Sequence, residues 1–349
     1  MEPAGLVADA VVERLEGICR GHGLVGLAAR LEALGELSRK DLGAVEEGLG
    51  GVRCEASVVG DSARHLLSLG GKRLRPLCVA LASRLGSGFG PAARELAVAV
   101  ELVHSATLLH DDVVDLGEVR RGAPTARQIW GNAASVFAGD WLLVEALERV
   151  RAAGVPGALE RLLLVIRQMI AAEAVQLEAR GRLSPDPRQY LAIVEGKTAA
   201  LFRWALWAGG RAGGIDESGC AALEAFGLHL GIAFQAVDDL LDFAGDAAAT
   251  GKSLFVDLRE GKMTWPLIVA VDAEPGLAAT LEATLREDAL PSLRTEILAA
   301  LQRTSAIAAT REFAAREAAL AIDCLRTLPS GEARRALETV AAATVERDR

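Results

Sequence analysis

The sequence is poor in aromatic residues and has no closely spaced pair of cysteines. Aromatic side chains make up 4% of its 349 residues, and its five cysteines lie far apart along the chain. No two of them form a Cys-x-x-Cys pair, and this spacing together with an odd count is typical of a reduced cytosolic protein. We therefore expect a cytoplasmic protein.

A basic leader, a long apolar run and an excess of positive charge are also missing. The chain begins Met-Glu-Pro and carries acidic residues early, which is unlike a secretory signal peptide. No apolar run approaches the length that a bilayer requires, so we expect no membrane span. The formal net charge of −9 argues against nucleic acid as a partner, because phosphate backbones bind clustered Lys and Arg. Small anionic ligands stay compatible with a local basic pocket.

The residues that the sequence has in abundance favour helices. Hydrophobic residues make up 51% of the chain, and the helix-favouring residues Ala and Leu dominate. Apolar residues recur at helical spacing over stretches of roughly 15–30 residues, separated by short Gly- and Pro-rich breaks. We predict an all-α fold, a single large helical bundle, with residues 1–45 as an N-terminal helical extension and residues 46–349 as the main domain.

An acidic cluster ends the apolar stretch Glu101–Asp115. Asp111 and Asp115 are four residues apart and project from one helix face, with Asp112 beside them. These carboxylates repel one another, and the helix dipole disfavours negative charge at a carboxyl terminus. Mg²⁺ relieves both problems, because it binds one or two protein carboxylates and completes its shell with water and phosphate oxygens. Taken alone, the motif fits a solvated acidic helix end equally well.

The same spacing recurs in the more apolar stretch Gly231–Phe243. It carries Asp238, Asp239 and Asp242 among Phe, Val and Leu residues. Solvation does not explain these carboxylates, because burying an uncompensated charge is prohibitive. We predict that the two Asp-Asp-x-x-Asp motifs face each other across a cavity and hold magnesium ions against a diphosphate.

Basic residues accompany the acidic motifs. The segment Gly70–Pro76 reads GGKRLRP and places Lys72 and Arg75 beside a glycine pair, and Arg120 and Arg121 follow the first acidic motif. Arg binds phosphate through two parallel hydrogen bonds, and Lys acts as a point charge. Either cluster alone fits a solvated basic turn. Beside acidic motifs that need a phosphate between them, these residues predict a diphosphate site.

Six segments, taken in order, resemble the trans-isoprenyl diphosphate synthases, also called polyprenyl synthetases. They are GGKRLRP, ELVHSATLLHDDVVDLGEVRRG, GNAASVFAGDWL, EGKTAALF, GIAFQAVDDLLDF and GKSLFVDLREGKMTWPL. Both Asp motifs together with GGKxxRP are highly specific to that family. The resemblance implies an isoprenoid-synthase fold with a central active-site cavity. It also implies a homodimer that condenses isopentenyl diphosphate head-to-tail with an allylic diphosphate.

The resemblance implies roles for individual residues. Three magnesium ions per active site are expected on Asp111, Asp112, Asp115, Asp238, Asp239 and Asp242. The diphosphate of isopentenyl diphosphate is expected on Lys72, Arg75, His104 and Arg121. The allylic diphosphate is expected on Arg120, Lys197, Lys252 and Lys262. Thr198 and Gln235 are expected beside a developing carbocation, which their dipoles stabilise. The expected catalytic set is Asp111, Asp115, Lys197, Thr198, Gln235 and Asp238.

One departure from the family pattern lies in the segment 254–256. The family often has Gly two residues before the Asp that matches Asp257, whereas this chain has Phe255. We expect this difference to affect the loop and not the chemistry.

The length of the product depends on the wall below the first Asp motif. Ala106 and Thr107 lie one turn before Asp111, where short-chain members of the family often carry an aromatic residue. Their small size predicts an open tunnel and a product of C30 to C50. The alternative is a floor formed deeper in the tunnel, for example by Phe137, Trp141 or Met169.

Four alternatives stay open at this point. A short-chain C20 geranylgeranyl diphosphate synthase is the first. A terpene cyclase shares the fold and the first Asp motif but has no use for GGKRLRP. A carboxylate-bridged di-iron bundle needs two Glu-x-x-His motifs, and only Glu101–His104 fits. A non-catalytic subunit of a hetero-oligomeric synthase is expected to have degraded Asp motifs, and both are intact. We favour the chain-elongating enzyme, whose hydrophobic product is compatible with loose membrane association.

Overall fold

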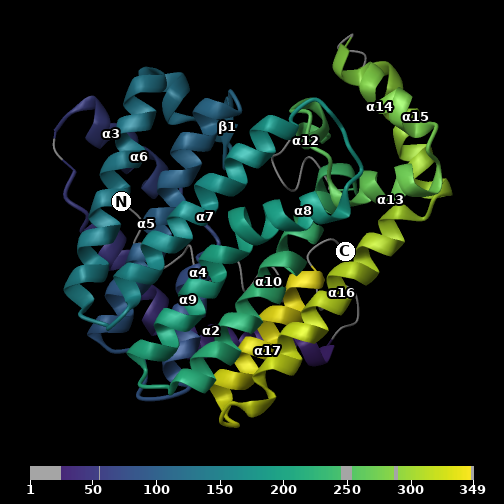
Figure 1. Cartoon of the computed structure of the whole chain (residues 1–349). Coiled ribbons are helices and arrows are strands. Elements are labelled where there is room, and N and C mark those ends of the chain that lie inside the picture. Colours follow the sequence, from purple (N-terminus) through teal and green to yellow (C-terminus); the bar gives the residue numbers. More distant parts are fainter. Residues whose placement is uncertain (1–24, 55, 245–253, 287–289, 347–349) are drawn as a thin grey trace. The chain divides into compact units, whose positions relative to one another are not determined.

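The computed structural model describes residues 25–54, 56–244, 254–286 and 290–346. The regular structure of these residues is helical, apart from one pair of two-residue strands (Figure 1). The prediction of an all-α fold is therefore confirmed.

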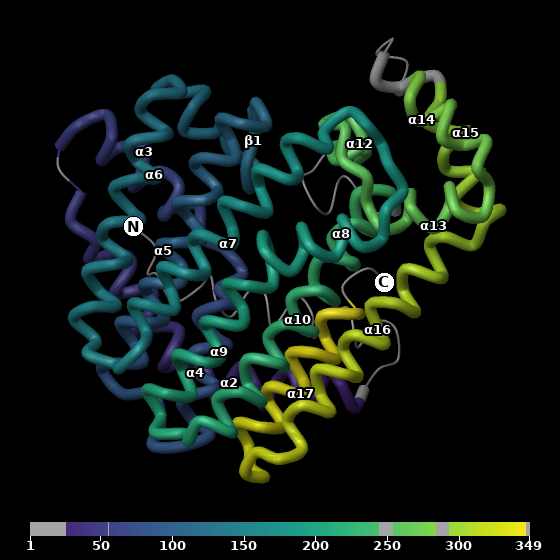
Figure 2. Tube along the Cα trace, viewed as in Figure 1, coloured from purple at the N-terminus to yellow at the C-terminus, as the bar shows by residue number. Residues whose placement is uncertain are grey.

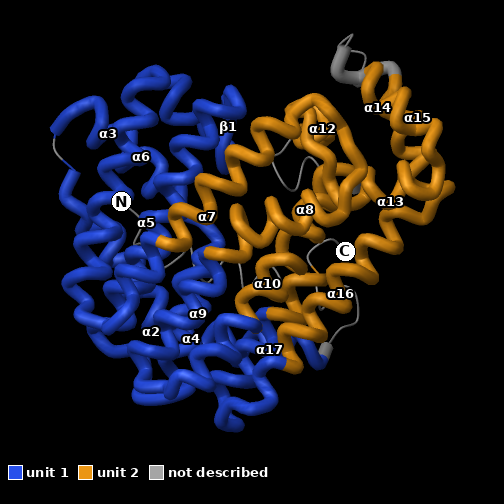
Figure 3. Tube along the Cα trace, viewed as in Figure 1, with its two compact units in different colours: residues 1–163, 201–225, 324–340 blue, residues 164–200, 226–323, 341–349 orange. Residues whose placement is uncertain are grey.

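Two compact units divide the chain, and each contains segments that are distant in sequence (Figure 3). Unit 1 comprises residues 1–163, 201–225 and 324–340, and unit 2 comprises residues 164–200, 226–323 and 341–349. The colours of Figure 2 follow the same chain from its purple N-terminal to its yellow C-terminal end. The extension expected over residues 1–45 stays a prediction; residue 45 lies within helix α2 (Val25–Gly50).

Unit 1 is a helical bundle in which the middle of helix α5 (Pro91–Val114) is buried. Its helices include α2, α3 (Val58–Ser68), α4 (Leu74–Arg84), α5, α6 (Ala126–Ala153), most of α9 (Ala200–Ala212) and most of α17 (Glu332–Val345). Pro91 opens α5 at a position that suits its fixed φ. No residue from Leu96 to Val103 is more than 2% exposed, as expected for a helix that is apolar on all sides. This burial gives the acidic end of α5 a rigid support.

A small hairpin follows α5 in unit 1. Strands β1 (Val119–Arg120) and β2 (Ala123–Pro124) pair antiparallel, with Arg120 opposite Ala123. Arg121 and Gly122 form the turn with φ of 52° and 78°. Positive φ at both central positions is typical of a type I′ turn, which matches the twist of a hairpin. The sequence does not reveal this hairpin, because two-residue strands leave no alternating pattern.

Unit 2 holds the remaining helices around two hydrophobic clusters. Its elements include α8 (Pro187–Val194), the π-helix η1 (Glu195–Ala199), α12 (Val256–Arg259), α13 (Trp265–Ala273), α14 (Leu277–Arg286), α15 (Leu290–Arg303) and most of α16 (Ala306–Cys324). One cluster includes Phe243, Phe255 and Leu258, and the other includes Tyr190 and Val237. Parts of α7 (Ala158–Ala179) and α10 (Glu217–Ala244) belong to each unit.

Helix α10 contains the most apolar long stretch of the described chain. Residues Glu217–Phe243 are long and apolar enough to cross a membrane by length and composition, so the expected absence of such a run does not hold. The core helix of a soluble protein passes the same test, and 56% of the relevant window is buried inside the structure. Three aspartates at the end of this stretch also fit a core helix with a polar site. The absence of a membrane span stays a prediction.

Candidate active site

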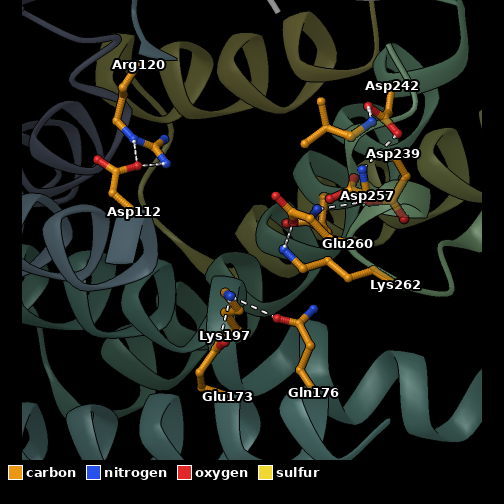
Figure 4. A network of polar contacts seen from close by, with 12 residues as sticks. Asp112, Arg120, Glu173, Gln176, Lys197, Asp239, Asp242, Asp257, Glu260 and Lys262 are labelled. Carbon is orange, nitrogen blue, oxygen red and sulfur yellow. Dashed lines mark hydrogen bonds and ion pairs between the residues drawn. The ribbon is translucent and has the colours of Figure 1, made fainter. Parts of the chain in front are cut away.

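The first aspartate motif lies at the end of α5 in unit 1. Asp111 and Asp115 are half-buried, whereas Asp112 is only 2% exposed. Arg120 donates from Nε and Nη2 to Oδ1 of Asp112 at 2.8 and 2.7 Å (Figure 4). Burial raises the pKa of Asp112, and the hydrogen bond from Arg120 opposes this rise. The middle carboxylate is therefore committed to an ion pair inside the protein.

The hairpin brings the two predicted basic segments together. Arg121, in its turn, lies against the glycine pair of the segment Gly70–Pro76. A Cβ atom at Gly71 would lie 2.8 Å from an Nη atom of Arg121, which is too close without a shift of that side chain. The missing side chain of Gly71 thus leaves room for a guanidinium group.

Arg73 has a structural part in the same segment that the sequence does not reveal. Its side chain is 1% exposed and donates to Glu46 of α2 and to Glu101 of α5, each at 2.6 Å. Its backbone adopts a left-handed conformation with φ of 47°. Two carboxylates compensate the buried guanidinium, as a buried charge requires. These two ion pairs tie the segment that carries Lys72 and Arg75 to α2 and α5.

His104, on α5, lies close to several arginines of other elements. Burial holds the pKa of His104 well below its usual range, and nearby positive charges lower it further. These charges belong to Arg75, Arg121, Arg120 and Arg73. His104 is therefore neutral at physiological pH and can donate one ring N–H. The predicted ligands His104, Arg75 and Arg121 thus lie close together in unit 1. Clustered positive charge in a chain of net charge −9 is suited to an anion.

The residues expected to set the product length occupy the middle of α5 and the surface of α6. Ala106 is 1% exposed, and the Thr107 hydroxyl donates to the carbonyl oxygen of His104 at 2.8 Å. Phe137 is 60% exposed and Trp141 is 38% exposed, beside a hollow of about 540 Å³. Within unit 1, these two aromatic residues therefore do not fill the interior.

The second aspartate motif lies near the end of α10 in unit 2, and its middle residue is buried. Asp239 is 1% exposed and accepts three hydrogen bonds. The donors are Gln235 Nε2 at 2.9 Å, the Tyr190 hydroxyl at 2.7 Å and the backbone N–H of Trp265 at 3.1 Å. Burial and the nearby charge of Asp257 raise the pKa of Asp239 to about 7. The three donors oppose that rise, since they favour the ionised form.

Asp242 holds the loop that follows α10. Its two carboxylate oxygens accept from the backbone N–H groups of Val256 at 2.9 Å and Asp257 at 3.2 Å (Figure 4). The carboxylate thereby binds the exposed N–H groups at the start of α12. Phe255 just before it has φ of 64°, a left-handed conformation. This conformation explains why glycine suits the position, and the ring of Phe255 is instead buried against Phe243.

A π-helix positions Lys197 and Thr198. The turn η1 interrupts the helical run between α8 and α9, and such turns often mark functional sites. Lys197 donates to Glu173 and, at 2.9 Å, to Gln176 of α7 (Figure 4). The Thr198 hydroxyl donates to Gln235 Oε1 at 2.9 Å. The predicted pair Thr198 and Gln235 is therefore joined directly.

Two glycines allow the π-helix to pack closely within unit 2. A Cβ atom on Gly196 would lie 2.6 Å from the Cβ of Ala172. A Cβ atom on Gly231 would lie 2.5 Å from the Cα of Ala199. Both helix contacts therefore depend on the absence of a side chain.

A pocket of about 140 Å³ lies in unit 2 beside these residues. Its lining includes Lys197, Thr198, Gln235, Asp239, Tyr190 and Lys262. Lys262 also donates to Glu260 at 2.5 Å (Figure 4). The predicted phosphate ligand Lys252 lies outside the described residues. The structure thus brings together five of the predicted residues of unit 2, and it adds Tyr190.

No group of three His, Cys, Asp or Glu side chains in the described chain is arranged to hold a metal ion alone.

Comparisons with known proteins identify the family of this chain. The family model for polyprenyl synthetase matches residues 56–301. The chain is 35% identical over 320 residues to heptaprenyl diphosphate synthase component 2 of Geobacillus stearothermophilus, covering 91% of this chain and 99% of the relative. It is 34% identical over 321 residues to octaprenyl diphosphate synthase of Escherichia coli K12, covering 91% and 99%.

A solved structure shows the same fold. It is a polyprenyl synthase from Caulobacter crescentus CB15, complexed with calcium and isoprenyl diphosphate. It superposes with a TM-score of 0.86 at 36% identity, covering 91% of this chain and 98% of that one.

The helical fold and the family match identify the chain as an enzyme of the trans-prenyltransferase class. The family match covers more than half of the chain, so the chain belongs to the polyprenyl synthetase family, as the sequence predicts.

Proposed function

We propose that the protein condenses isopentenyl diphosphate head-to-tail with an allylic diphosphate in a magnesium-dependent reaction. The product is a trans-polyprenyl diphosphate of C30 to C50. The observation that carries this proposal is the group of arginines around His104, next to the acidic end of α5 in a chain of net charge −9. Such a group suits a diphosphate, whose charge needs both cations and bidentate guanidinium groups.

Three of the four outer carboxylates of the two motifs suit Mg²⁺ best. Asp112, Asp239 and Asp242 already accept hydrogen bonds from groups inside the protein. We propose Asp111, Asp115 and Asp238 as the metal ligands among the six expected ones, because their side chains are partly exposed and their oxygen donors fit a hard cation. When bound, the metal neutralises charge on the diphosphate. The number of ions, expected as three, is part of the proposal.

The protein's own side chains bind and orient the two substrates. Arg75, His104 and Arg121 would bind isopentenyl diphosphate together with Lys72. Arg120, Lys197 and Lys262 would bind the allylic diphosphate, with Lys252 as a further ligand. These cations stabilise the leaving diphosphate as the allylic C–O bond breaks.

Thr198 and Gln235 would stabilise the cation that this cleavage leaves. The isopentenyl double bond then forms the new C–C bond, and the resulting cation loses a proton to the departed diphosphate. Helix packing around the pocket would keep water from the cation.

The small side chains of Ala106 and Thr107 support the longer product. The curated relatives named above carry heptaprenyl and octaprenyl in their names, which agrees with this range. Ala106→Phe would shorten the product, because an aromatic ring would block the tunnel one turn below Asp111. A C20 product from the unaltered protein would support the short-chain alternative.

The partners of this chain are part of the same proposal. We infer a cytoplasmic homodimer, without nucleic acid, whose hydrophobic product allows loose association with a membrane surface. The Geobacillus relative is named as one component of a synthase, which makes a heteromeric assembly the alternative. The mass of the purified protein in solution and its activity without a second chain distinguish the two.

A product assay tests the function. The purified protein is incubated with Mg²⁺, labelled isopentenyl diphosphate and farnesyl or geranylgeranyl diphosphate, and the products are sized after phosphatase treatment. We expect a magnesium-dependent ladder that ends between C30 and C50. The absence of incorporation with every primer would overturn the proposal and favour a cyclase or a subunit that needs a partner.

A further inference from the structure

Tyr190 joins two parts of the candidate site in unit 2. It is the single tyrosine of the chain and lies on α8, just before the π-helix that carries Thr198. Its side chain is 7% exposed and its hydroxyl donates to Asp239 Oδ2 at 2.7 Å. The hydrogen bond therefore ties α8 to α10 inside the protein. The mechanism proposed above assigns Tyr190 no part.

Asp239 passes this restraint on to Gln235. Asp239 Oδ1 accepts from Gln235 Nε2 at 2.9 Å, so the nitrogen end of the amide is fixed. The other end, Gln235 Oε1, accepts from the Thr198 hydroxyl at 2.9 Å. A carboxylate cannot accept from the oxygen end of an amide, so the amide has one orientation. The carbonyl dipole of Gln235 is thereby turned toward Thr198.

These contacts form a closed circuit. It runs from Tyr190 to Asp239, then to Gln235 and Thr198, and returns along the backbone of α8 and η1. All four residues line the pocket of about 140 Å³. Because the circuit is closed, it restricts each side chain more than a single hydrogen bond does.

The ring of Tyr190 is held separately from its hydroxyl. It packs against Trp265 with ring centroids 5.2 Å apart, and Trp265 stacks on Phe313 at 4.2 Å. Loss of the hydroxyl alone would therefore leave the hydrophobic packing in place. The two contributions can be separated by experiment.

We propose that Tyr190 is a positioning residue of prenyl transfer, which acts through Asp239 to fix the Gln235 amide against Thr198. The inference rests on the proposed function, in which Gln235 and Thr198 face the developing cation. An amide that is free to turn would present its N–H₂ group to that cation for part of the time, which disfavours the transition state.

The test is a double-mutant cycle of Tyr190→Phe and Gln235→Ala in the full-length protein. In the wild-type background we expect Tyr190→Phe to lower kcat about tenfold and to change the KM of either substrate by less than about threefold. In the Gln235→Ala background, the same change is expected to lower kcat by less than about twofold. A merely structural Tyr190 would give the same loss in both backgrounds.

A matched control removes a different buried hydroxyl of unit 2. Thr310 on α16 is fully buried and donates only to the Ala306 carbonyl of its own helix, at 2.8 Å. Thr310→Val is expected to leave kcat within about twofold of the wild type. The proposal is overturned if Tyr190→Phe behaves like this control, or if its loss of kcat persists without Gln235. A wild-type protein that transfers no prenyl group would contradict the proposed function. It would not contradict the hydrogen bonds of the circuit.

A second readout does not depend on activity. Because the chain has one tyrosine, 3-fluorotyrosine labels Tyr190 alone. We expect Asp239→Asn to shift the single fluorine resonance, since the acceptor of the hydroxyl changes from a carboxylate to an amide. An unchanged resonance would show that Tyr190 does not bond to Asp239 in solution and would overturn the proposal.

Discussion

Asp112 and Asp239 occupy the same place in two copies of one motif, yet the protein compensates their burial differently. Asp112 is 2% exposed and binds the guanidinium of Arg120, a charged partner. Asp239 is 1% exposed and binds only neutral donors, from α8, α10 and the start of α13. Burial raises the pKa of both, and that of Asp239 reaches about 7. The spacing therefore fixes which carboxylate is buried, and its neighbours fix how the charge is stabilised.

The outer carboxylates show the largest expected effect of this division. We expect Asp111→Asn and Asp238→Asn each to lower the rate of prenyl transfer by about 10²- to 10³-fold, because each removes a proposed metal ligand. The rate at which the purified variants incorporate labelled isopentenyl diphosphate measures this loss. Asp272→Asn, at an exposed carboxylate at the end of α13, is the control and should retain the wild-type rate. A mild loss in either motif would contradict the proposed metal roles.

Removal of the middle carboxylate of either motif should lower the stability of the protein, and by different amounts. Asp239→Ala leaves three buried donors without an acceptor, and we expect a loss of about 3 kcal/mol in the free energy of unfolding. Asp112→Ala should cost less, about 2 kcal/mol, because the Arg120 side chain is 29% exposed and can reach water. Urea unfolding at neutral pH measures both. Equal losses would show that the exposure of the donor side chain does not determine the loss of stability.

Gly231 and Gly71 differ in what a side chain at their position would meet. A Cβ at Gly231 would meet the backbone of Ala199, which cannot move alone, so Gly231→Ala should cost about 2 kcal/mol. A Cβ at Gly71 would meet the end of the Arg121 side chain, which can shift. We therefore expect Gly71→Ala to cost less than about 1 kcal/mol but to raise the KM for isopentenyl diphosphate. Gly43→Ala on α2, where nothing lies within 4 Å, is the control for thermal unfolding.

The smallest expected effect is a pH dependence that His104 gives to unit 1. Its folded-state pKa is held well below the ordinary value of about 6.5, which applies to the unfolded chain. Below that ordinary value, the unfolded chain binds a proton that the folded chain does not bind. Stability should therefore fall as the pH drops below about 6.5, with no contribution from His104 above it.

His104→Gln should flatten the acid side of the stability curve, as followed by circular dichroism in urea. An identical acid slope in the variant and in the wild type would assign the effect to other groups.

Local patterns predict much of this molecule. The helical spacing of apolar residues indicates the all-α fold, and the contrast between carboxylates and their apolar surroundings indicates both Asp motifs. The grouping of Arg75, His104 and Arg121 is also expected, because these residues need a shared anion. These residues do lie near one another in unit 1, and their binding roles stay predictions.

Contacts between distant residues are what the sequence does not reveal. Tyr190 and Asp239 are separated by 49 positions, and a lone tyrosine in an apolar helix is typical of a core residue. Arg73 stands among predicted phosphate ligands but turns inward to Glu46 and Glu101. Only the fold determines which of several neighbouring charged residues is buried. The glycine that the family often has at the position of Phe255 was the one local signal of a left-handed backbone there.

A magnesium titration of prenyl transfer tests the division between outer and middle carboxylates most directly. The rate is measured against Mg²⁺ concentration for the wild type and for Asp111→Asn, Asp112→Asn, Asp238→Asn and Asp239→Asn. We expect the two outer variants to need more Mg²⁺ for half-maximal rate, and the two middle variants to lose rate at an unchanged Mg²⁺ requirement. A magnesium requirement that rises as much in Asp239→Asn as in Asp238→Asn would contradict this account.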